Sequence, residues 1–160
     1  MLHQWRFPNQ WEWNIILAFS EEEISAKDFL QHFNEKEKTK YGLDDKEFIS
    51  NVRPPCALHD YATRSTIIWI DEPNGSIENI ETLNHEFIHL MTAISENVGF
   101  PINENTDECW AYFIGSLNNM ALGSIFEYLK EKKKLKGSKN VIKSYEETGY
   151  GRGLYEKEEI

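Results

Sequence analysis

The chain has 160 residues, a formal net charge of −10, and 40% hydrophobic and 13% aromatic residues. This length and composition suit one folded domain with a real core. The acidic balance disfavours a nucleic-acid partner, because phosphate backbones are also negative, and no stretch reaches the roughly 18 consecutive apolar residues of a membrane span.

The N-terminal segment and the cysteines bear on the compartment. The apolar run 13–19 is interrupted by Asn14 and is followed by no small-residue cleavage site, so we expect no signal peptide. Cys56 and Cys109 are isolated and have no C-x-x-C spacing. A reduced, cytoplasmic setting is therefore the default expectation.

The first half of the chain predicts one strand and two helices. Residues 11–19 are rich in Trp, Ile and Phe and predict a strand. Ser20 opens an S-x-x-E capping box, which predicts a helix running to about Lys40 and closed by Gly42. Asp44 or Asp45 is expected to cap a short helix that ends near residue 51.

The middle of the chain predicts a second strand followed by a long amphipathic helix. Residues 63–71 form the strand, and Ser76 is a plausible cap for a helix that Gly99 ends. Apolar residues recur in this helix at steps of three and four, which predicts one buried stripe. The stripe consists of Ile80, Leu83, Phe87, Met91, Ile94 and Val98.

Residues 85–89 of this helix read His-Glu-Phe-Ile-His. His85 and His89 lie one turn apart on one helical face, so both imidazoles can bind a single Zn²⁺ ion. At about 100° per residue they fall roughly 140–180° away from the apolar stripe. Glu86 points to the side of the pair, where it can take a proton from zinc-bound water. The plainer interpretation is a pair of surface histidines beside a solvated glutamate.

A catalytic zinc site needs a third protein ligand, and the best candidate is Glu108 at the start of a second helix. Ala111 and Gly115 share its face, and such small residues would let this helix press against the first one. Asp107 and Glu104 are fallback ligands. The plainer role of Glu108 is an interaction with the helix dipole at the surface.

The rest of the chain extends this helix and adds a tail. We expect the helix to be buried and to continue to about Lys136, with a weak point at Gly123. The plainer role of Tyr112 is core packing, and the alternative is a hydrogen bond to a metal ligand or to a substrate oxyanion. Residues 137–160 contain three glycines among tyrosines and predict a loosely packed tail. The organisation is therefore one domain over 1–136, followed by this tail.

HEFIH followed by a helix that begins Glu108-x-x-Ala111-Tyr112 resembles the zincin metallopeptidases of the gluzincin type, and is most similar to minimal HExxH domains of small bacterial and bacteriophage proteins. The resemblance covers about residues 62–117. It implies an α+β fold in which a small mixed sheet packs on the HExxH helix and on a second, ligand-bearing helix. It also implies that strand 63–71 lies beside the cleft and pairs with extended peptide substrate.

The resemblance implies a zinc ligand set of His85, His89 and Glu108. Larger gluzincins carry an Asn-Glu-x-x-x-Asp-like motif, whereas here Glu104 is followed by Asp107 three positions later, which favours Glu108. No clear counterpart is found of the downstream His or Tyr that stabilises the oxyanion in those larger members.

The leading functional hypothesis is a zinc-dependent metallopeptidase that cleaves a peptide or protein substrate, with Glu86 as general base. The alternative is a catalytically inactive zincin-like binding or structural protein, with a protein partner in a phage-related or other larger assembly. A third hypothesis is a closed structural zinc site, with Asp107 or Cys109 as fourth ligand.

Overall fold

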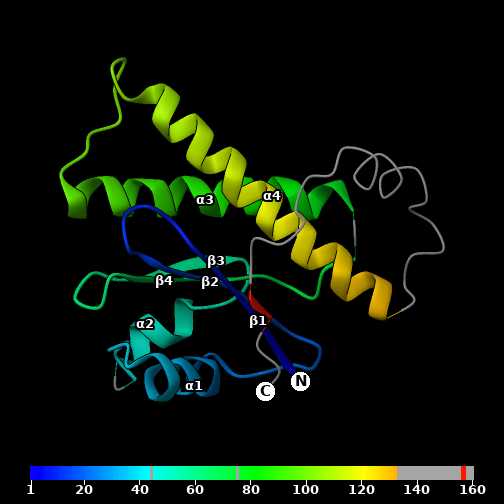
Figure 1. The fold of residues 1–160 in the computed structure, drawn as a ribbon. Coiled ribbons are helices and arrows are strands. Elements are labelled where there is room, and N and C mark those ends of the chain that lie inside the picture. The colour runs from blue at the N-terminus through cyan, green and yellow to red at the C-terminus, as the bar shows by residue number, and fades with distance from the viewer. Residues whose placement is uncertain (44, 75, 133–155, 158–160) are drawn as a thin grey trace.

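The computed structural model describes residues 1–43, 45–74, 76–132 and 156–157, and one mixed β-sheet lies between two layers of helices (Figure 1). The strands are β1 (Leu2–Phe7), β2 (Asn14–Ser20), β3 (Cys56–Asp60), β4 (Ser65–Trp69) and the short β5 (Glu156–Lys157). The helices are α1 (Ala26–Glu37), α2 (Lys46–Asn51), α3 (Ile77–Val98) and α4 (Asp107–Glu131). The expected α+β class with a small mixed sheet is confirmed.

The strand order in the sheet is β3-β4-β2-β1-β5. β2 and β4 are parallel, whereas β1 with β2, β3 with β4 and β1 with β5 are antiparallel. The parallel pair requires a crossover, which α1, α2 and β3 supply. In the strand order given above, β3 forms one edge of the sheet.

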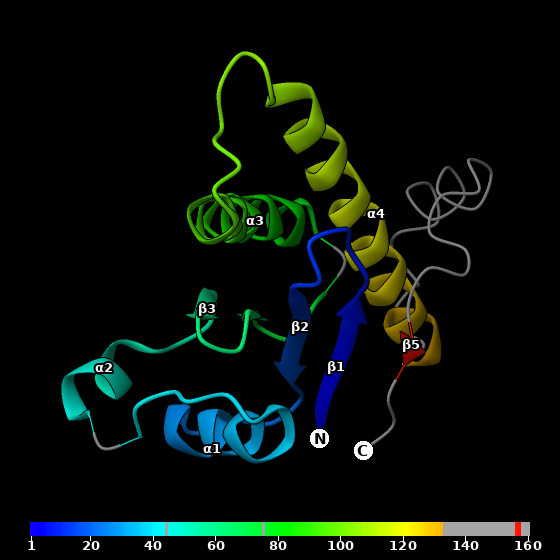
Figure 2. The same ribbon diagram turned by 60° about the vertical axis from the view of Figure 1, so that its left-hand side comes forward.

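Each face of the sheet has its own core. α3 and α4 cover one face, and α1 and α2 lie on the other (Figure 2). β2 is buried on both sides because its alternate residues enter different cores: Leu17 packs toward α3 and α4, and Ile16 packs toward α1. This is why its sequence is almost continuously apolar instead of alternating.

The boundaries predicted for the first helix are wrong. Ser20 ends β2, and the helix begins after Ser25, whose hydroxyl accepts a hydrogen bond from the Asp28 backbone N–H at 3.1 Å. It ends at Glu37, followed by Lys38 in the left-handed conformation at φ 56°. The predicted cap of the short helix is confirmed at Asp45.

The predicted strand 63–71 forms as β4, but it does not lie at the edge of the sheet. It pairs with β3 on one side and with β2 on the other. The sequence prediction missed β3, which is a short strand that starts directly after a proline pair. It also missed β1, and the strand predicted over 11–19 begins only at Asn14.

The HExxH helix has the predicted limits, with Ser76 before it and Gly99 after it at φ 67°. α4 runs without a break through Gly123, which is buried. The predicted extension to residue 136 and most of the predicted tail lie outside the described residues, so the domain boundary at 136 stays a prediction. Within the described chain, no helix combines the length and apolar character needed to cross a membrane.

Candidate metal centre

α3 presents His85 and His89 together on its exposed side. Their Nε2 atoms are 3.1 Å apart, and the two rings meet edge to face at 71°. Two nitrogen ligands of one tetrahedral Zn²⁺, each about 2.05 Å from the metal, lie about 3.3 Å apart. The pair thus has nearly the spacing of two ligands of one ion, although the same distance also suits a hydrogen bond between one protonated and one unprotonated nitrogen.

The predicted separation between the histidines and the apolar stripe is confirmed at the centre of α3. Leu83, Phe87 and Ile94 are fully buried against the sheet. Ile88, between the two histidines in sequence, is 54% exposed. The core therefore holds one side of the helix while the imidazoles face outward.

Glu86 is buried, with only 4% of its surface exposed. Its carboxylate accepts a hydrogen bond from the backbone N–H of Ala57, so it lies between α3 and the edge strand β3. Burial raises the pKa of Glu86, and the nearby charges of His85 and His89 oppose that rise. We predicted that Glu86 points to the side of the histidine pair. We did not predict that β3 lies against Glu86 and helps to bury it.

The buried carboxylate also affects the pKa of a side chain on β3. Burial raises the pKa of the Cys56 thiol to about 12, and the negative charge of Glu86 contributes to the rise. Cys56 is therefore a neutral thiol near pH 7 and not a nucleophile.

The structure does not bring Glu108 to the histidine pair. Glu108, Asp107 and Glu104 are all exposed. Among the residues that the structure describes, no three His, Cys, Asp or Glu side chains gather closely enough to hold a metal ion. The role of Glu108 as third ligand therefore stays a prediction.

The prediction of a small-residue face that presses α4 onto α3 is wrong. Ala111 and Gly115 are exposed, and a Cβ atom added to Gly115 would meet nothing within 4 Å. The helices instead meet further along, where Asn118 Nδ2 donates to Asn84 Oδ1 at 2.8 Å. The first turns of α4 bury a different face, which includes Trp110.

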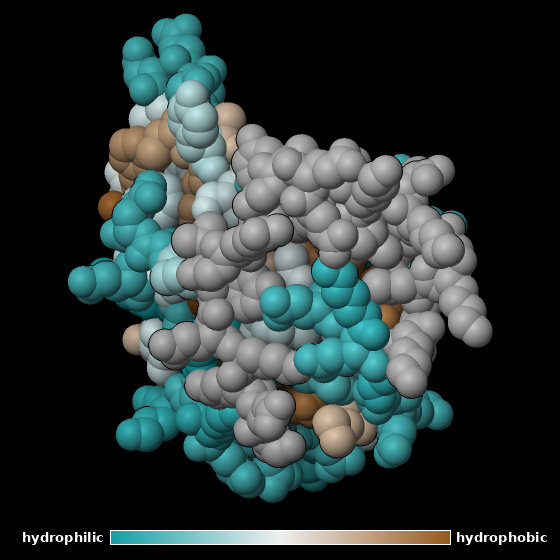
Figure 3. Space-filling view, turned by 45° about the vertical axis from the view of Figure 1, so that its right-hand side comes forward, coloured by the Kyte–Doolittle hydropathy of each residue, from teal (hydrophilic) through white to brown (hydrophobic). Residues whose placement is uncertain are grey.

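Tyr112 was expected in the core, and this is also wrong, because 73% of it is exposed. Ile102, in the loop before α4, is 44% exposed. Hydrophobic surface accordingly gathers near the top of the molecule, beside this loop (Figure 3). The start of α4 therefore has an apolar surface that the described residues do not cover.

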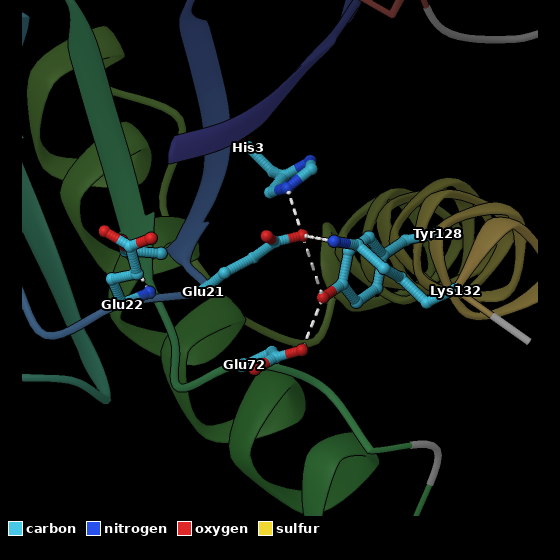
Figure 4. Close-up of polar contacts among 7 residues, drawn as sticks. His3, Glu21, Glu22, Glu72, Tyr128 and Lys132 are labelled. Carbon is cyan, nitrogen blue, oxygen red and sulfur yellow. Dashed lines mark hydrogen bonds and ion pairs between the residues drawn. The ribbon is translucent and has the colours of Figure 1, made fainter. Parts of the chain in front are cut away.

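The other end of α4 is tied to the sheet by a polar cluster (Figure 4). Glu21, directly after β2, accepts a hydrogen bond from His3 at 2.9 Å and pairs with Lys132. The Tyr128 hydroxyl is 2.5 Å from Glu72 and 3.4 Å from Glu21, so it donates to the nearer carboxylate. These contacts hold the C-terminal turn of α4 against the ends of β2 and β4.

The sequence prediction gave no role to His59, because it lies before the HExxH helix in the chain. His59 lies on β3 directly opposite Thr66 of β4, and its Nδ1 is 2.9 Å from the Thr66 hydroxyl. That hydroxyl also accepts a hydrogen bond from Trp13 Nε1 at 2.9 Å. A hairpin over 56–69 would have paired the two residues, but its first strand lacks the alternation of a typical strand and was not recognised.

The hydrogen bonds that link Trp13, Thr66 and His59 determine which ring nitrogen of His59 carries the hydrogen. Trp13 can only donate, so the fully buried Thr66 hydroxyl needs an acceptor for its own hydrogen. His59 Nδ1 is the acceptor that the described contacts provide, and an unsatisfied buried hydroxyl would cost about 1–3 kcal/mol. We therefore assign the hydrogen of the neutral ring to Nε2. Burial, aided by the charge of His89, lowers the pKa of His59 to about 4.

Comparison with known proteins adds no relative: no family model matches the chain, and neither a curated protein nor a solved structure is significantly similar to it.

Proposed function

We propose that the chain is a zinc-dependent metallopeptidase with a minimal zincin-like fold. One observation carries the proposal: the two Nε2 atoms converge at 3.1 Å on the exposed face of α3, and the carboxylate between them in sequence is buried against an edge strand. A plain surface pair of histidines does not require the buried carboxylate. Burying one is costly, and it is a feature of functional sites.

His85 and His89 would hold the metal, and their donor atoms suit Zn²⁺. When bound, the ion would supply Lewis acidity and lower the pKa of water. Glu86 would accept a proton from the attacking water and deliver it to the leaving amine. Its raised pKa supports this role, because a carboxylate that binds a proton more readily is a better base.

Glu108 remains the proposed third ligand, with Glu104 and Asp107 as the fallbacks. Its use would require the first turns of α4 to move toward α3, and the exposed apolar surface there is consistent with a segment that packs differently when metal is bound. Glu108→Gln should lower zinc affinity more than Glu104→Gln does. Equal affinities in a competition titration with a chromogenic chelator would remove Glu108 from the proposal.

The decisive variant is Glu86→Gln, because glutamine keeps an oxygen that can accept the Ala57 N–H but cannot take up the proton. We expect the variant to bind zinc as the wild type does and to lose cleavage of fluorescein-labelled casein. Glu96→Gln is the matched control, since Glu96 is exposed on the same helix. Cleavage by Glu86→Gln at the wild-type rate would refute the mechanism.

The alternative is a catalytically inactive zincin-like protein that binds a partner, in a phage-related or other larger assembly. It is favoured by the lack of a third ligand beside the histidine pair within the described residues. This alternative predicts zinc-loaded wild-type protein that cleaves no unfolded polypeptide. Four protein ligands in a metal-bound structure would instead select the closed structural site.

A further inference from the structure

His59 lies on β3, the edge strand whose Ala57 N–H bonds to Glu86 of the proposed centre. β3 places Ala57 and His59 on the same face of the sheet, because successive side chains alternate. Ala57 bonds to Glu86, and His59 lies close enough to His89 for the charge of His89 to be felt. The side chain of His59 therefore lies on the α3 side of β3, two residues along the strand from the N–H that bonds to Glu86.

The imidazole of His59 is oriented by a chain of hydrogen bonds that starts in the core. Trp13, only 2% exposed, donates to Thr66, and Thr66 donates to His59 Nδ1. Because Nδ1 of His59 accepts from Thr66, the Nε2–H is the ring donor that no described hydrogen bond uses. A neutral imidazole with a hydrogen on Nε2 is a hydrogen-bond donor there and has no lone pair for a metal.

We propose that His59 is a catalytic residue, whose Nε2–H donates a hydrogen bond to the carbonyl oxygen of the scissile peptide bond. The inference rests on the proposed peptidase function and supplies the oxyanion-stabilising group that the sequence did not identify. The role is electrostatic: a positioned donor stabilises the negative charge that develops on that oxygen.

The step balances without transfer of the His59 proton. The water oxygen forms a bond to the carbonyl carbon, the C=O π pair moves onto the oxygen, and Glu86 accepts the water proton. The C–N bond then breaks, its electron pair goes to nitrogen, and Glu86 returns the proton to that nitrogen. His59 strengthens one hydrogen bond during the addition and relaxes when the carbonyl reforms.

The test compares His59→Phe, which fills the site without a donor, with His59→Gln, which keeps an N–H. The matched control is His32→Phe, because His32 lies on α1, beyond the opposite face of the sheet. With zinc-loaded protein and labelled casein, His59→Phe should lower kcat by about 10²–10³-fold, with KM and zinc content unchanged. His59→Gln should recover part of this loss, and His32→Phe should stay within about twofold of the wild type.

A second readout is independent of turnover. Long-range ¹H–¹⁵N correlation spectra of the metal-free protein at pH 7 should show His59 neutral with its hydrogen on Nε2, and Thr66→Val should shift the hydrogen toward Nδ1. Hydrogen on Nδ1 in the wild type, or wild-type kcat in His59→Phe, would overturn the inference alone. Zinc-loaded wild type that cleaves nothing would refute the proposed function and, with it, this role for His59.

Discussion

Replacing Glu21 by Gln should destabilise the protein by a predictable amount. The Lys132 ammonium, together with the hydrogen bond from His3, lowers the pKa of Glu21 from 4.5 to about 2. At about 1.36 kcal/mol per pKa unit, this difference corresponds to at most roughly 3.4 kcal/mol of preference for the charged form in the folded state. Lys132 is 39% exposed, so solvent and salt screen the pair. We expect a loss of about 1–2 kcal/mol, or roughly 3–6 °C in Tm for a chain of this size.

The sign of the effect depends on pH. Because the folded-state pKa is lowered, the charged carboxylate stabilises the fold at pH values above 4.5, and that contribution is lost as pH falls toward 2. Thermal unfolding of wild type and Glu21→Gln should therefore differ most near pH 6–7 and converge at acid pH. Added salt at pH 7 should narrow the gap.

Glu22→Gln is the control for Glu21→Gln, because the Glu22 side chain is exposed and points away from the cluster (Figure 4). If Glu21→Gln and Glu22→Gln unfold at the same temperature at pH 7, the cluster does not anchor α4. A gap of constant size from pH 7 down to pH 2 would show that the loss comes from packing and not from the charge.

Two further predictions concern the candidate metal centre. Zinc at 100 times its dissociation constant should stabilise the wild type by about 2.7 kcal/mol, seen as a rise in Tm, and should have no such effect on His89→Ala; equal rises would place the metal elsewhere. Metal-free Glu86→Gln should be more stable than the wild type at pH 7, because burial raises the pKa of Glu86 and makes its charged form costly. That gain in stability should shrink as pH falls through the raised pKa of Glu86. Urea titrations at pH 4 and pH 7 measure it, and a gain that is larger at pH 4 than at pH 7 would contradict the prediction.

The sequence predicted α3 well because several signals agreed there. The 3.6-residue period, a serine before the helix and a glycine after it all pointed to the same limits, and the structure has them. The first helix failed because two serines compete as caps. Ser20 has the capping-box pattern, but β2 runs through it, so pairing in the sheet overrides the local signal and Ser25 caps the helix.

The edge strand could not be predicted from local pattern. β3 has five residues, contains a histidine and an aspartate, and follows two prolines, so it lacks the alternation of a typical strand. Its existence depends on pairing with β4, which is a contact made in three dimensions. Missing it concealed both the enclosure of Glu86 and the position of His59.

The error at α4 has a related cause. Ala111 and Gly115 permit close approach of another helix, but small side chains do not attract one, and a larger apolar face on the same helix decides how it packs. Trp110, Phe113 and Leu117 form that face and bury themselves in the core above the sheet, which turns Glu108 toward solvent. Sequence spacing sets which residues share a face, and the competition for burial sets which face is used.

One residue of α3 is unfavourable for the stability of the fold. A glutamate at position 86 is costly to the fold, because the residue is only 4% exposed and burial raises the pKa of its carboxyl group. A leucine or glutamine there would suit a helix that only covers a sheet. The imidazoles of His85 and His89 converge beside it on the exposed face. A buried glutamate beside two converging imidazoles lowers the stability of the fold without improving its packing, and this supports the proposed metal centre.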